Sequence, residues 1–422
     1  MISDNDFKNR NRKTEKMFTR LRSLPFAVVL TMVLRKSVKS LQCIVNETMR
    51  DLGLDEVTAS AYSQARYKLK HTAFIELNQK AIVDVFYQDN DFNKFWDKRI
   101  LAIDGSKIRL PNTQEICDTF GTIAYSQGQD SEVQGEHPYA LASVLFDVLN
   151  RVSIDATLAQ ANAYEVNLAI AHLKHTQCDD LLLMDRNYPS YRMLATCIHS
   201  ERDFAIRCSA ASFGVARRML KGGGADSQIV VLRPCAEQIP MIHASGLPET
   251  LTVRFVRVLL STGEFEVLVT SLLDETRYPT HDFLTLYGLR WGIETFYGVI
   301  KTRLTLENFS GLGVEAVKQD FYATLYLSGL ESILTDQAQA LLDAKDTQYP
   351  QKVNRAVSFN AIKTQAFSLL MSNLATDVIF DKLTAVFLKN PCLERKDRNP
   401  PRKKSSATVL LNYHKRLKKH CF

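Results

Sequence analysis

The chain has 422 residues, of which 45% are hydrophobic and 23% are charged. This composition is typical of a folded globular protein and excludes a disordered or collagen-like chain. At about 100–200 residues per domain, the length predicts two to four domains. The longest apolar run, from Pro25 to Leu34, is much shorter than the ~20 residues that span a bilayer. No signal-peptide pattern opens the chain, so we expect a cytoplasmic protein without a membrane partner.

The cysteines are scattered, with no Cys-x-x-Cys pair and no paired histidines at metal-ligand spacing. This pattern excludes an extracellular disulfide framework and a zinc finger. We expect reduced and mostly buried thiols. The eight cysteines stand at positions 43, 117, 178, 197, 208, 235, 392 and 421.

The net charge of +7 is concentrated at the two ends of the chain. Residues 391–422 carry ten Lys and Arg against two acids, a net charge of +8, which leaves about −1 for the rest. Residues 1–22 form a second basic cluster with a net charge of +4. Basic ends on a near-neutral body favour arms that neutralise a polyanion such as DNA. A solubilising tail is the alternative.

Apolar residues recur at helical spacing between residues 17 and 88, which predicts a helical N-terminal region. Within it, Thr58 or Ser60 could cap a short helix. The polar face of that helix carries Ser63, Gln64, Arg66 and Lys68. Such a helix could read a DNA groove, or it could be an ordinary surface helix.

From residue 99 onward, short apolar strands alternate with helices, which predicts an α/β domain. The predicted strands cover residues 100–103, 137–149, 152–158, 180–184 and 204–208, with helices at 165–175 and 188–199. Residues 209–278 are expected to form a β-rich insertion with strands at 228–232, 252–260 and 264–272. A long helix is predicted from residue 282 to about 304, followed by further helices over 313–390.

Two of the predicted strands end in an aspartate, Asp104 and Asp185. The carboxyl ends of strands are where active sites gather in α/β sheets, although each aspartate taken singly could be a turn or helix cap. Two carboxylates on neighbouring strands repel each other unless a cation lies between them. Oxygen ligands of this kind suit Mg²⁺.

The helix predicted after residue 282 carries a polar stripe. At 100° per residue, an arc of about 60° contains Tyr287, Arg290, Glu294 and Lys301. A row of salt bridges is one interpretation, because Arg290 and Glu294 are four residues apart. Against it, the same helix carries Trp291 and three glycines, and each glycine costs about 1 kcal/mol relative to alanine. Close approach of DNA or of another element would explain Gly288, Gly292 and Gly298.

The stripe resembles the Tyr-x2-Arg-x3-Glu-x6-Lys signature of DDE transposases, specifically of the family named after insertion sequence four. The segments Ile103-Asp-Gly-Ser106 and Leu183-Met-Asp-Arg-Asn-Tyr188 match that family's other two acidic motifs. Spacings of 81 and 109 residues between the three acids agree with an insertion between the second and the third. The resemblance extends from about residue 20 to residue 330.

The resemblance implies an α/β ribonuclease-H-like catalytic core with a β-rich insertion, flanked by α-helical N- and C-terminal regions. The DNA-binding N-terminal region would cover residues 1–95 and the first part of the core residues 96–208. The insertion would cover residues 209–278, the last catalytic helix residues 279–310, and the helical C-terminal region with its basic tail residues 311–422.

The resemblance also implies that Asp104, Asp185 and Glu294 are catalytic acids that bind two Mg²⁺ ions, for which Mn²⁺ can substitute. One ion would activate water or a DNA 3′-hydroxyl, and the other would stabilise the leaving oxygen. The DNA contacts would be made by Tyr287, Arg290, Trp291 and Lys301. Arg186, beside the second acid, is either a phosphate contact or a salt-bridge partner.

One feature departs from some relatives of that family. The only tryptophans are Trp96 and Trp291, so the insertion has no tryptophan to stack on a base. Phe213, Phe255 or Phe265 could substitute, because any aromatic face can stack on a base.

We therefore expect a transposase of a bacterial insertion sequence that acts on the nucleoid by cut-and-paste transposition. It would bind the terminal inverted repeats and the target as double-stranded DNA, with two copies of the chain forming a homodimer around the paired ends. The alternatives are a catalytically inactive, transposase-derived DNA-binding protein and a nuclease on the same core. A terminal 3′-hydroxyl joined to target DNA distinguishes the transposase from the nuclease.

Overall fold

The computed structural model describes residues 1–19, 23–125, 135–371 and 375–395, so most of the basic tail lies outside the described residues. The chain forms two compact units. The first contains residues 1–88, 108–140 and the chain from 298 onward, and the second contains residues 89–107 and 141–297. This division groups the N-terminal helices with the C-terminal ones, and the five segments expected from the sequence remain a prediction. Within the described ranges, none of the helices has the length and apolar composition needed to cross a bilayer.

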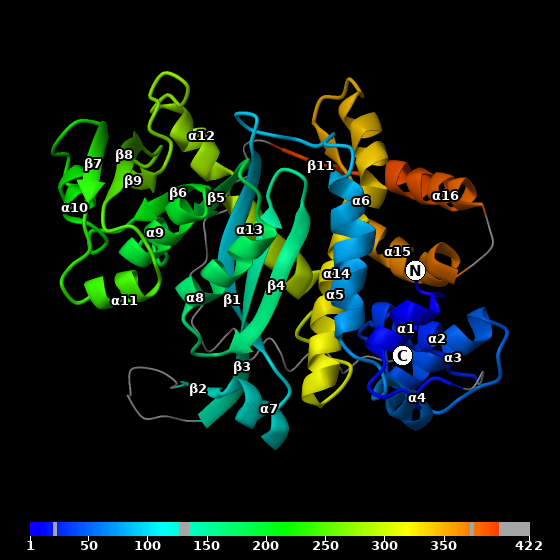
Figure 1. The fold of residues 1–422 in the computed structure, drawn as a ribbon. Coiled ribbons are helices and arrows are strands. Elements are labelled where there is room, and N and C mark those ends of the chain that lie inside the picture. Colours follow the sequence, from blue (N-terminus) through cyan, green and yellow to red (C-terminus); the bar gives the residue numbers. More distant parts are fainter. Residues whose placement is uncertain (20–22, 126–134, 372–374, 396–422) are drawn as a thin grey trace. The chain divides into compact units, whose positions relative to one another are not determined.

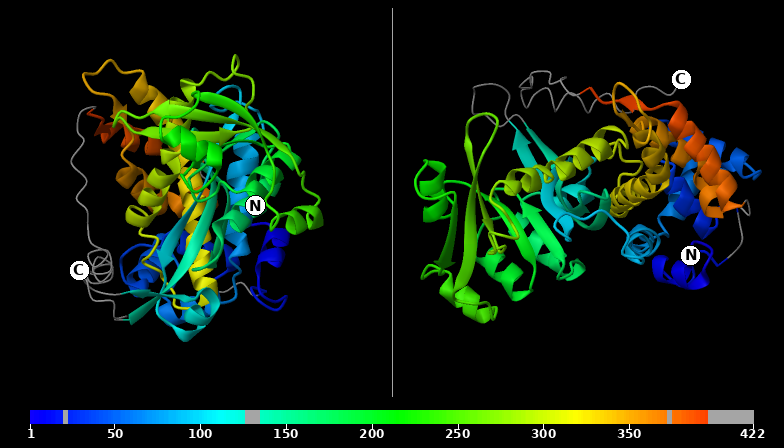
Figure 2. Two further views of the ribbon diagram at one scale, coloured as in Figure 1. Left: turned by 90° about the vertical axis from the view of Figure 1, so that its left-hand side faces the viewer. Right: turned by 90° about the horizontal axis from the view of Figure 1, so that it is seen from above.

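The first unit is mostly helical. Its N-terminal helices are α1 (Asn5–Asn11), α2 (Phe26–Leu34), α3 (Leu41–Asp51), α4 (Ala59–Arg66), α5 (Thr72–Asn78), a π-helical turn (Gln79–Val83) and α6 (Asp84–Tyr87). The other elements are α7 (Gln114–Phe120), β2 (Thr122–Tyr125), α14 (Val314–Asp343), β10 (Gln351–Lys352), α15 (Arg355–Met371), α16 (Thr376–Lys389) and β11 (Cys392–Leu393). The long helix α14 packs against α2 and α5 on one side and against α15 and α16 on another, so segments from both ends of the chain surround it (Figure 2).

A buried ion pair joins α4 to α14. Arg66 is only 4% exposed and donates to Asp320 at 2.8 Å and to Gln319 at 2.6 Å. The hydroxyl of Thr58 accepts a hydrogen bond from the backbone N–H of Ala61, which confirms one of the two expected caps of α4. The placement of Arg66 on a DNA-reading face is wrong, because its guanidinium is buried against α14.

The second unit is built around a mixed sheet, so the protein is an α/β structure. Its strands are β1 (Arg99–Arg109), β3 (Gly135–Asp147), β4 (Val152–Gln160), β5 (Asp180–Met184), β6 (Asp203–Cys208), β7 (Ser227–Leu232), β8 (Leu251–Leu259) and β9 (Phe265–Thr270). The strand order is β3-β1-β5-β6-β9-β8-β7, with β4 on β3. The neighbours β1 and β5, and β5 and β6, are parallel, whereas β9 and β8 are antiparallel to the strands beside them.

The region expected as a β-rich insertion does contain the three predicted strands, β7, β8 and β9. These strands extend the central sheet, because β9 pairs with β6 from Ala205↔Thr270 to Cys208↔Val267. The same region also contains two short helices, α10 (Gly214–Leu220) and α11 (Ile239–Ala244).

Two helices cover one face of this sheet near its centre. They are α8 (Glu165–His172), which continues into a 3-10 turn (Leu173–His175), and α9 (Tyr191–His199), and they pack against each other and against β4 and β6 (Figure 1). All five residues of β5 are buried, which is the pattern of a strand covered on both faces. Ser190 caps α9 by accepting a hydrogen bond from Met193, so α9 begins three residues later than predicted.

The single helix predicted over residues 282–304 is wrong. Two helices occupy this segment, α12 (Asp282–Gly288) and α13 (Trp291–Thr302). Between them, the backbone N–H groups of Leu289 and Arg290 bond to carbonyls three residues back instead of four, at 3.1 Å each. This tightening breaks the helix. The polar stripe therefore runs over two helices and the turn that joins them.

The seven described cysteines are all free. Only Cys197 and Cys208 are buried, so the expectation of mostly buried thiols is wrong. Burial raises the pKa of each of these two thiols to about 12, which keeps both protonated and unreactive at neutral pH.

Candidate active site

Asp104 and Asp185 start from neighbouring backbone positions. Strands β1 and β5 pair in parallel from Arg99↔Asp180 to Ile103↔Met184, and the two aspartates are the next residues on each strand. β5 ends at Met184, as predicted. β1 continues to Arg109, so the prediction that this strand ends at Asp104 is wrong. The parallel register therefore brings together two acids that are 81 residues apart in the sequence.

The electrostatic environment of Asp104 disfavours its charged form. Burial raises the pKa of Asp104 to about 7, and the negative charges of Asp185 and Glu165 act in the same direction. The backbone N–H of Gly105, which donates to Asp104 at 2.9 Å, and the positive charge of Arg290 oppose this shift. A divalent cation beside Asp104 and Asp185 would offset the repulsion between them.

Glu294, the third predicted acid, is held in an ion pair. The Nη2 atom of Arg290 donates to Oε1 of Glu294 at 2.8 Å. Arg290 is only 4% exposed, and its guanidinium carbon lies 5.4 and 5.1 Å from the ring centres of Tyr287 and Trp291. The Glu294 side chain is 40% exposed and open to solvent on its other side.

The donor set of this site suits a divalent cation only in part. Among the described residues, no three acidic, His or Cys side chains are gathered as the ligands of one ion. Asp104 and Asp185 form a pair of adjacent oxygen ligands of the kind that Mg²⁺ prefers. Glu294 could join them only through the carboxylate oxygen that does not accept from Arg290, unless the ion pair separates.

Two tyrosines fix the backbone on which the aspartates stand. The hydroxyl of Tyr287 donates to the carbonyl of Met184, directly before Asp185, at 3.4 Å. The hydroxyl of Tyr297 lies 3.0 Å from the carbonyl of Asp104 and 2.9 Å from that of Ala142. Tyr297 was not among the predicted site residues, and its position three residues after Glu294 on the same helix is the signal that could have found it.

The residues predicted to contact DNA differ in their exposure. Trp291 is 46% exposed, and Arg186 is exposed and forms no ion pair with any described residue, which favours a phosphate contact over a salt bridge. Tyr287 is only 3% exposed. Lys301 stands 4.0 Å from Glu307, and burial lowers the pKa of this lysine.

The phenylalanines expected to replace a stacking tryptophan are not equivalent. Phe255 is fully buried, and Phe213 packs edge-on against it with 5.7 Å between the ring centres. Phe265 is 39% exposed, with the guanidinium carbon of Arg257 4.7 Å from its ring centre. Of the three, Phe265 is the one with an exposed ring.

A chain of hydrogen bonds from Ser143 through His172 to Asp155 has the connectivity of a nucleophile relay, at 3.0 and 2.7 Å. Ser143 and His172 are fully buried, so no substrate can reach the hydroxyl. Burial alone would raise the pKa of Asp155, but the hydrogen bond from His172 lowers it. The arrangement is a hydrogen-bonded network that fastens α8 to β3 and β4.

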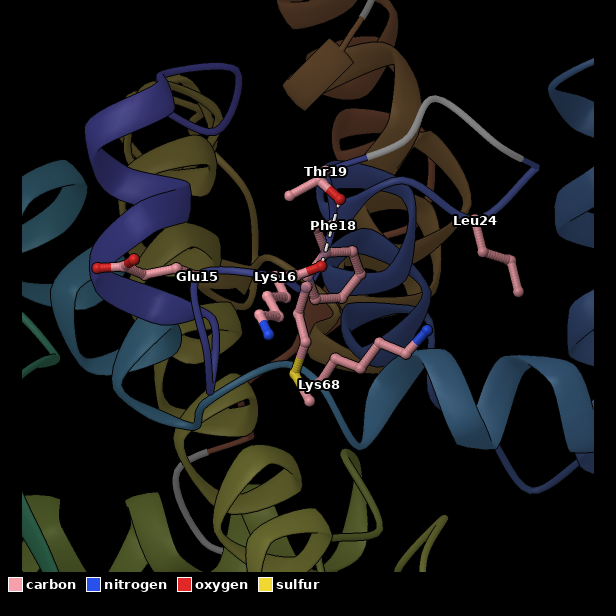
Figure 3. Close-up of a pocket in the computed structure, with 7 residues that line it drawn as sticks. Glu15, Lys16, Phe18, Thr19, Leu24 and Lys68 are labelled. Carbon is pink, nitrogen blue, oxygen red and sulfur yellow. Dashed lines mark hydrogen bonds between the residues drawn. The ribbon is translucent and has the colours of Figure 1, made fainter.

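A second surface with features of a nucleic-acid interface lies in the first unit. A pocket of about 590 Å³ is lined by Glu15, Lys16, Met17, Phe18, Thr19, Leu24 and Lys68 (Figure 3). The hydroxyl of Thr19 donates to the carbonyl of Lys16 at 3.2 Å across one wall (Figure 3). Beside Lys68, Tyr67 is 65% exposed and the Lys13 ammonium lies 3.4 Å from its ring centre. Cations beside an exposed aromatic ring suit phosphates and bases.

Residues 95–328 match a family model described as "Transposase DDE domain". The chain is 26% identical over 277 residues to "Transposase InsG for insertion sequence element IS4" of Escherichia coli (strain K12). That alignment covers 64% of this chain and 59% of InsG, so the chain spans about three fifths of this relative's length. A solved structure, "Cryo-EM structure of piggyBac transposase synaptic complex with hairpin DNA (SNHP)", aligns with a TM-score of 0.41 at 10% identity over 90% of this chain and 78% of that chain.

Proposed function

The chain belongs to the transposase DDE domain family, which covers more than half of its length, and from this premise we propose that it is the transposase of a bacterial insertion sequence. It cleaves DNA at the ends of its element and joins the freed 3′-hydroxyls to target DNA. The similarity to InsG supports an element of the insertion-sequence-four type.

One observation carries this proposal: the parallel register of β1 and β5 brings Asp104 beside Asp185, and the carbonyl of Asp104 is contacted by Tyr297 from the helix that carries Glu294. Three acids on two adjacent strands and one helix are the kind of ligand set that metal-dependent phosphoryl transfer uses, and this supports the proposal. The mixed sheet around β1 and β5 supports a ribonuclease-H-like core.

The proposal assigns Asp104, Asp185 and Glu294 to two divalent cations, Mg²⁺ or Mn²⁺. When bound, these ions supply an activated oxygen nucleophile and stabilise the leaving oxygen. Arg186, Arg290 and Lys301 would neutralise backbone phosphates. Trp291 would stack on an exposed base.

DNA binding beyond the site would use the first unit, where Lys16 and Lys68 line the pocket and Tyr67 stands exposed. This surface would bind the terminal inverted repeats on the nucleoid. Two protomers would then act together on paired ends, so that both ends of the element react in one complex.

The test is a strand-transfer assay. The purified chain is incubated with labelled DNA that carries the ends flanking its gene, a supercoiled target plasmid and Mg²⁺. The proposal predicts labelled ends joined covalently to the plasmid. Cleaved but unjoined ends would instead identify a nuclease, and tight end binding without cleavage in Mg²⁺ or Mn²⁺ would identify an inactive DNA-binding protein.

A further inference from the structure

A second cavity lies in the first unit, beside the start of α3. It has a volume of about 270 Å³, and its lining comes from residues between 37 and 44 and from residues 308–310. Both segments belong to the same compact unit. Neither contributes to the catalytic residues or to the DNA-binding surface proposed above, so the role of this cavity has to be derived from its own chemistry.

A buried asparagine without a side-chain partner lines this cavity. Asn308 is only 6% exposed. Its backbone N–H donates to the carbonyl of Thr305 at 2.9 Å, but its side-chain amide forms no hydrogen bond with any described residue. An amide carries two donors and one acceptor, and buried polar groups are almost always hydrogen-bonded. The amide of Asn308 therefore indicates a hydrogen-bonding ligand in the cavity.

The first turn of α3 supplies further donors at the same place. Ser40, the N-cap, and Leu41, the first residue of this 11-residue helix, both line the cavity. The Ser40 hydroxyl accepts a hydrogen bond from the backbone N–H of Cys43 at 3.3 Å. The backbone N–H groups of Leu41 and Gln42 form no hydrogen bond with a described group. Unpaired N–H groups at the positive end of a helix dipole favour an anion.

Positive charge is in excess beside the wall of the cavity that Phe309 and Ser310 form. The ammonium of Lys36 lies 5.3 Å from the ring centre of Phe309, and the guanidinium of Arg66 donates to the hydroxyl of Ser310 at 2.7 Å. Both cations are buried, and both lie against the single carboxylate of Asp320, at 4.0 and 2.8 Å. One negative charge does not neutralise two positive ones, so this region attracts an anion.

The ordinary explanation of a buried, unpaired amide is an ordered water molecule. Water would satisfy Asn308, but it carries no charge and does not balance the two cations. A phosphate has several acceptor oxygens and a negative charge, so it can accept from the amide and from the start of α3 at once. Asparagine side chains, backbone N–H groups and helix N-termini are among the usual donors to DNA phosphates.

We propose that this cavity binds a phosphate group, which accepts hydrogen bonds from the Asn308 amide and from the backbone N–H groups of Leu41 and Gln42. The backbone of the element's DNA is the source of this phosphate, and that part of the inference rests on the proposed function. Such a contact fixes the position of DNA on the first unit without reading its sequence. Free phosphate has the same chemistry, so the experiment tests the two sources in separate arms.

The first arm measures the binding of labelled element ends to the full chain by fluorescence anisotropy. Asn308→Asp keeps the shape of the side chain and replaces its donors with a negative charge. It is expected to weaken binding at least about tenfold, the size of a lost hydrogen bond to a charged group. The matched control is Asn360→Asp, which makes the same change at an exposed residue of α15 and is expected to bind as the wild type does.

DNA with one neutral methylphosphonate linkage distinguishes a direct contact from a structural role. At one position along the element end, this linkage is expected to weaken binding by the wild type and by Asn360→Asp, and to have no further effect on Asn308→Asp. If every linkage affects Asn308→Asp as it affects the wild type, Asn308 contacts no phosphate of the DNA.

The second arm titrates inorganic phosphate into the full chain without DNA and follows the phosphorus NMR signal. The wild type is expected to bind phosphate and Asn308→Asp to lose this binding. Loss of phosphate binding in Asn308→Asp with unchanged DNA binding would contradict DNA as the source of the phosphate. Unchanged binding in both arms would overturn the whole proposal.

A second variant keeps the test valid if thermal melting shows that Asn308→Asp does not fold. Val38→Glu places a negative charge on a lining residue that is 43% exposed, and its control is Val85→Glu, at an exposed residue of α6. Val38→Glu is expected to weaken the binding of element ends, and wild-type affinity would contradict the proposal.

The two claims fail in different ways. If the wild type cleaves and joins element ends and a folded Asn308→Asp binds them equally well, the phosphate site is wrong and the proposed function stands. If the wild type does not bind element ends at all, the proposed function and the DNA source fail together, and loss of inorganic phosphate in Asn308→Asp would still support the anion site.

Discussion

Arg290 donates a hydrogen bond to Glu294 at 2.8 Å, so the acid predicted as the third metal ligand is neutralised by its own neighbour on the chain. The guanidinium is buried, while the Glu294 side chain remains 40% exposed. Only Oε1 of Glu294 accepts this hydrogen bond, so a cation bound by the other carboxylate oxygen would share the carboxylate with Arg290. Arg290 also favours the charged form of Asp104, so a single side chain acts on two of the three acids.

Arg290→Gln is expected to strengthen the binding of Mn²⁺ in the absence of DNA. The variant removes a positive charge that repels the cation and competes for Glu294. A charge effect of about 1 kcal/mol at an intermediate dielectric corresponds to roughly fivefold tighter binding. Cleavage of DNA is expected to fall, because the phosphate contact proposed for Arg290 would be lost. Calorimetric titration beside Arg233→Gln, an exposed control, checks the sign. Weaker Mn²⁺ binding by Arg290→Gln would contradict this account of the pair.

Gly298→Ala is expected to stabilise the fold and impair the reaction. A Cβ at Gly298, an exposed residue of α13, would meet no atom within 4 Å, so alanine should raise the free energy of unfolding by up to about 1 kcal/mol. Retention of a costly glycine on an open surface indicates close approach of DNA, and we expect cleavage to fall several-fold. Urea denaturation and end cleavage test the two parts. If the variant is more stable and still cleaves normally, close approach of DNA is not the reason for glycine at position 298.

Gly292 is the useful comparison on the same helix. A Cβ there would lie 3.1 Å from Cβ of Val148, so packing within the protein already accounts for this glycine. From the sequence alone, close approach of DNA and close approach of another structural element were both possible reasons for the glycines of this segment. The structure separates them residue by residue.

The local pattern of the sequence was sufficient to locate most strands of the sheet, and the catalytic role of the acids stays a prediction. The apolar run of β5 ends at Met184, directly before Asp185, as predicted. The start of α8 at Glu165 was also predicted correctly. The register of β1 against β5 could not be predicted, because it depends on contacts between residues about 80 positions apart. Arg66 has the polarity of a surface residue, and only the position of Asp320 on α14 explains its burial. The break at Arg290 was likewise hidden, since helical spacing continues across it.

Asp320→Asn is expected to destabilise the first unit by about 3–5 kcal/mol, the usual cost of removing one partner from a buried ion pair. Asp320 is buried, accepts from Arg66 at 2.8 Å and lies 4.0 Å from Nζ of Lys36, so the variant leaves two buried cations without their counter-charge. The control is Asp343→Asn on the same helix, because this exposed residue contacts only Gln339 one turn away in the described structure. Urea unfolding that shifts equally in both variants would show that the buried network contributes little.

Because of Lys363, the free energy of unfolding is expected to rise at alkaline pH. Burial, and next the charge of Lys36, lower the pKa of Lys363 to about 8, whereas Asp320 opposes the shift. The unfolded chain then binds more protons than the folded chain between pH 8 and about 10.5, so this lysine adds stability as the pH rises through that window. The gain is up to about 3 kcal/mol. Below pH 8 the lysine is charged in both states and the full penalty of burying it remains.

The measurement for Lys363 is the pH dependence of unfolding in urea, compared with Lys363→Met. The amine donates to the carbonyl of Lys36 at 2.7 Å, and methionine keeps the length of the side chain without its charge. The difference in unfolding free energy between the two proteins should favour the variant at pH 7 and shrink toward pH 10. A difference that does not vary with pH would refute the lowered pKa.

The central claim is that Asp104, Asp185 and Glu294 together catalyse metal-dependent cleavage of DNA. The most direct measurement compares cleavage of labelled element ends in Mg²⁺ by the wild-type chain, by Asp185→Asn and by Asp179→Asn, an exposed aspartate six residues earlier. We predict cleavage at the element boundary by the wild-type and Asp179→Asn proteins, and at least a thousandfold loss in a folded Asp185→Asn protein that still binds the ends. Normal cleavage by Asp185→Asn would contradict the assignment of the site.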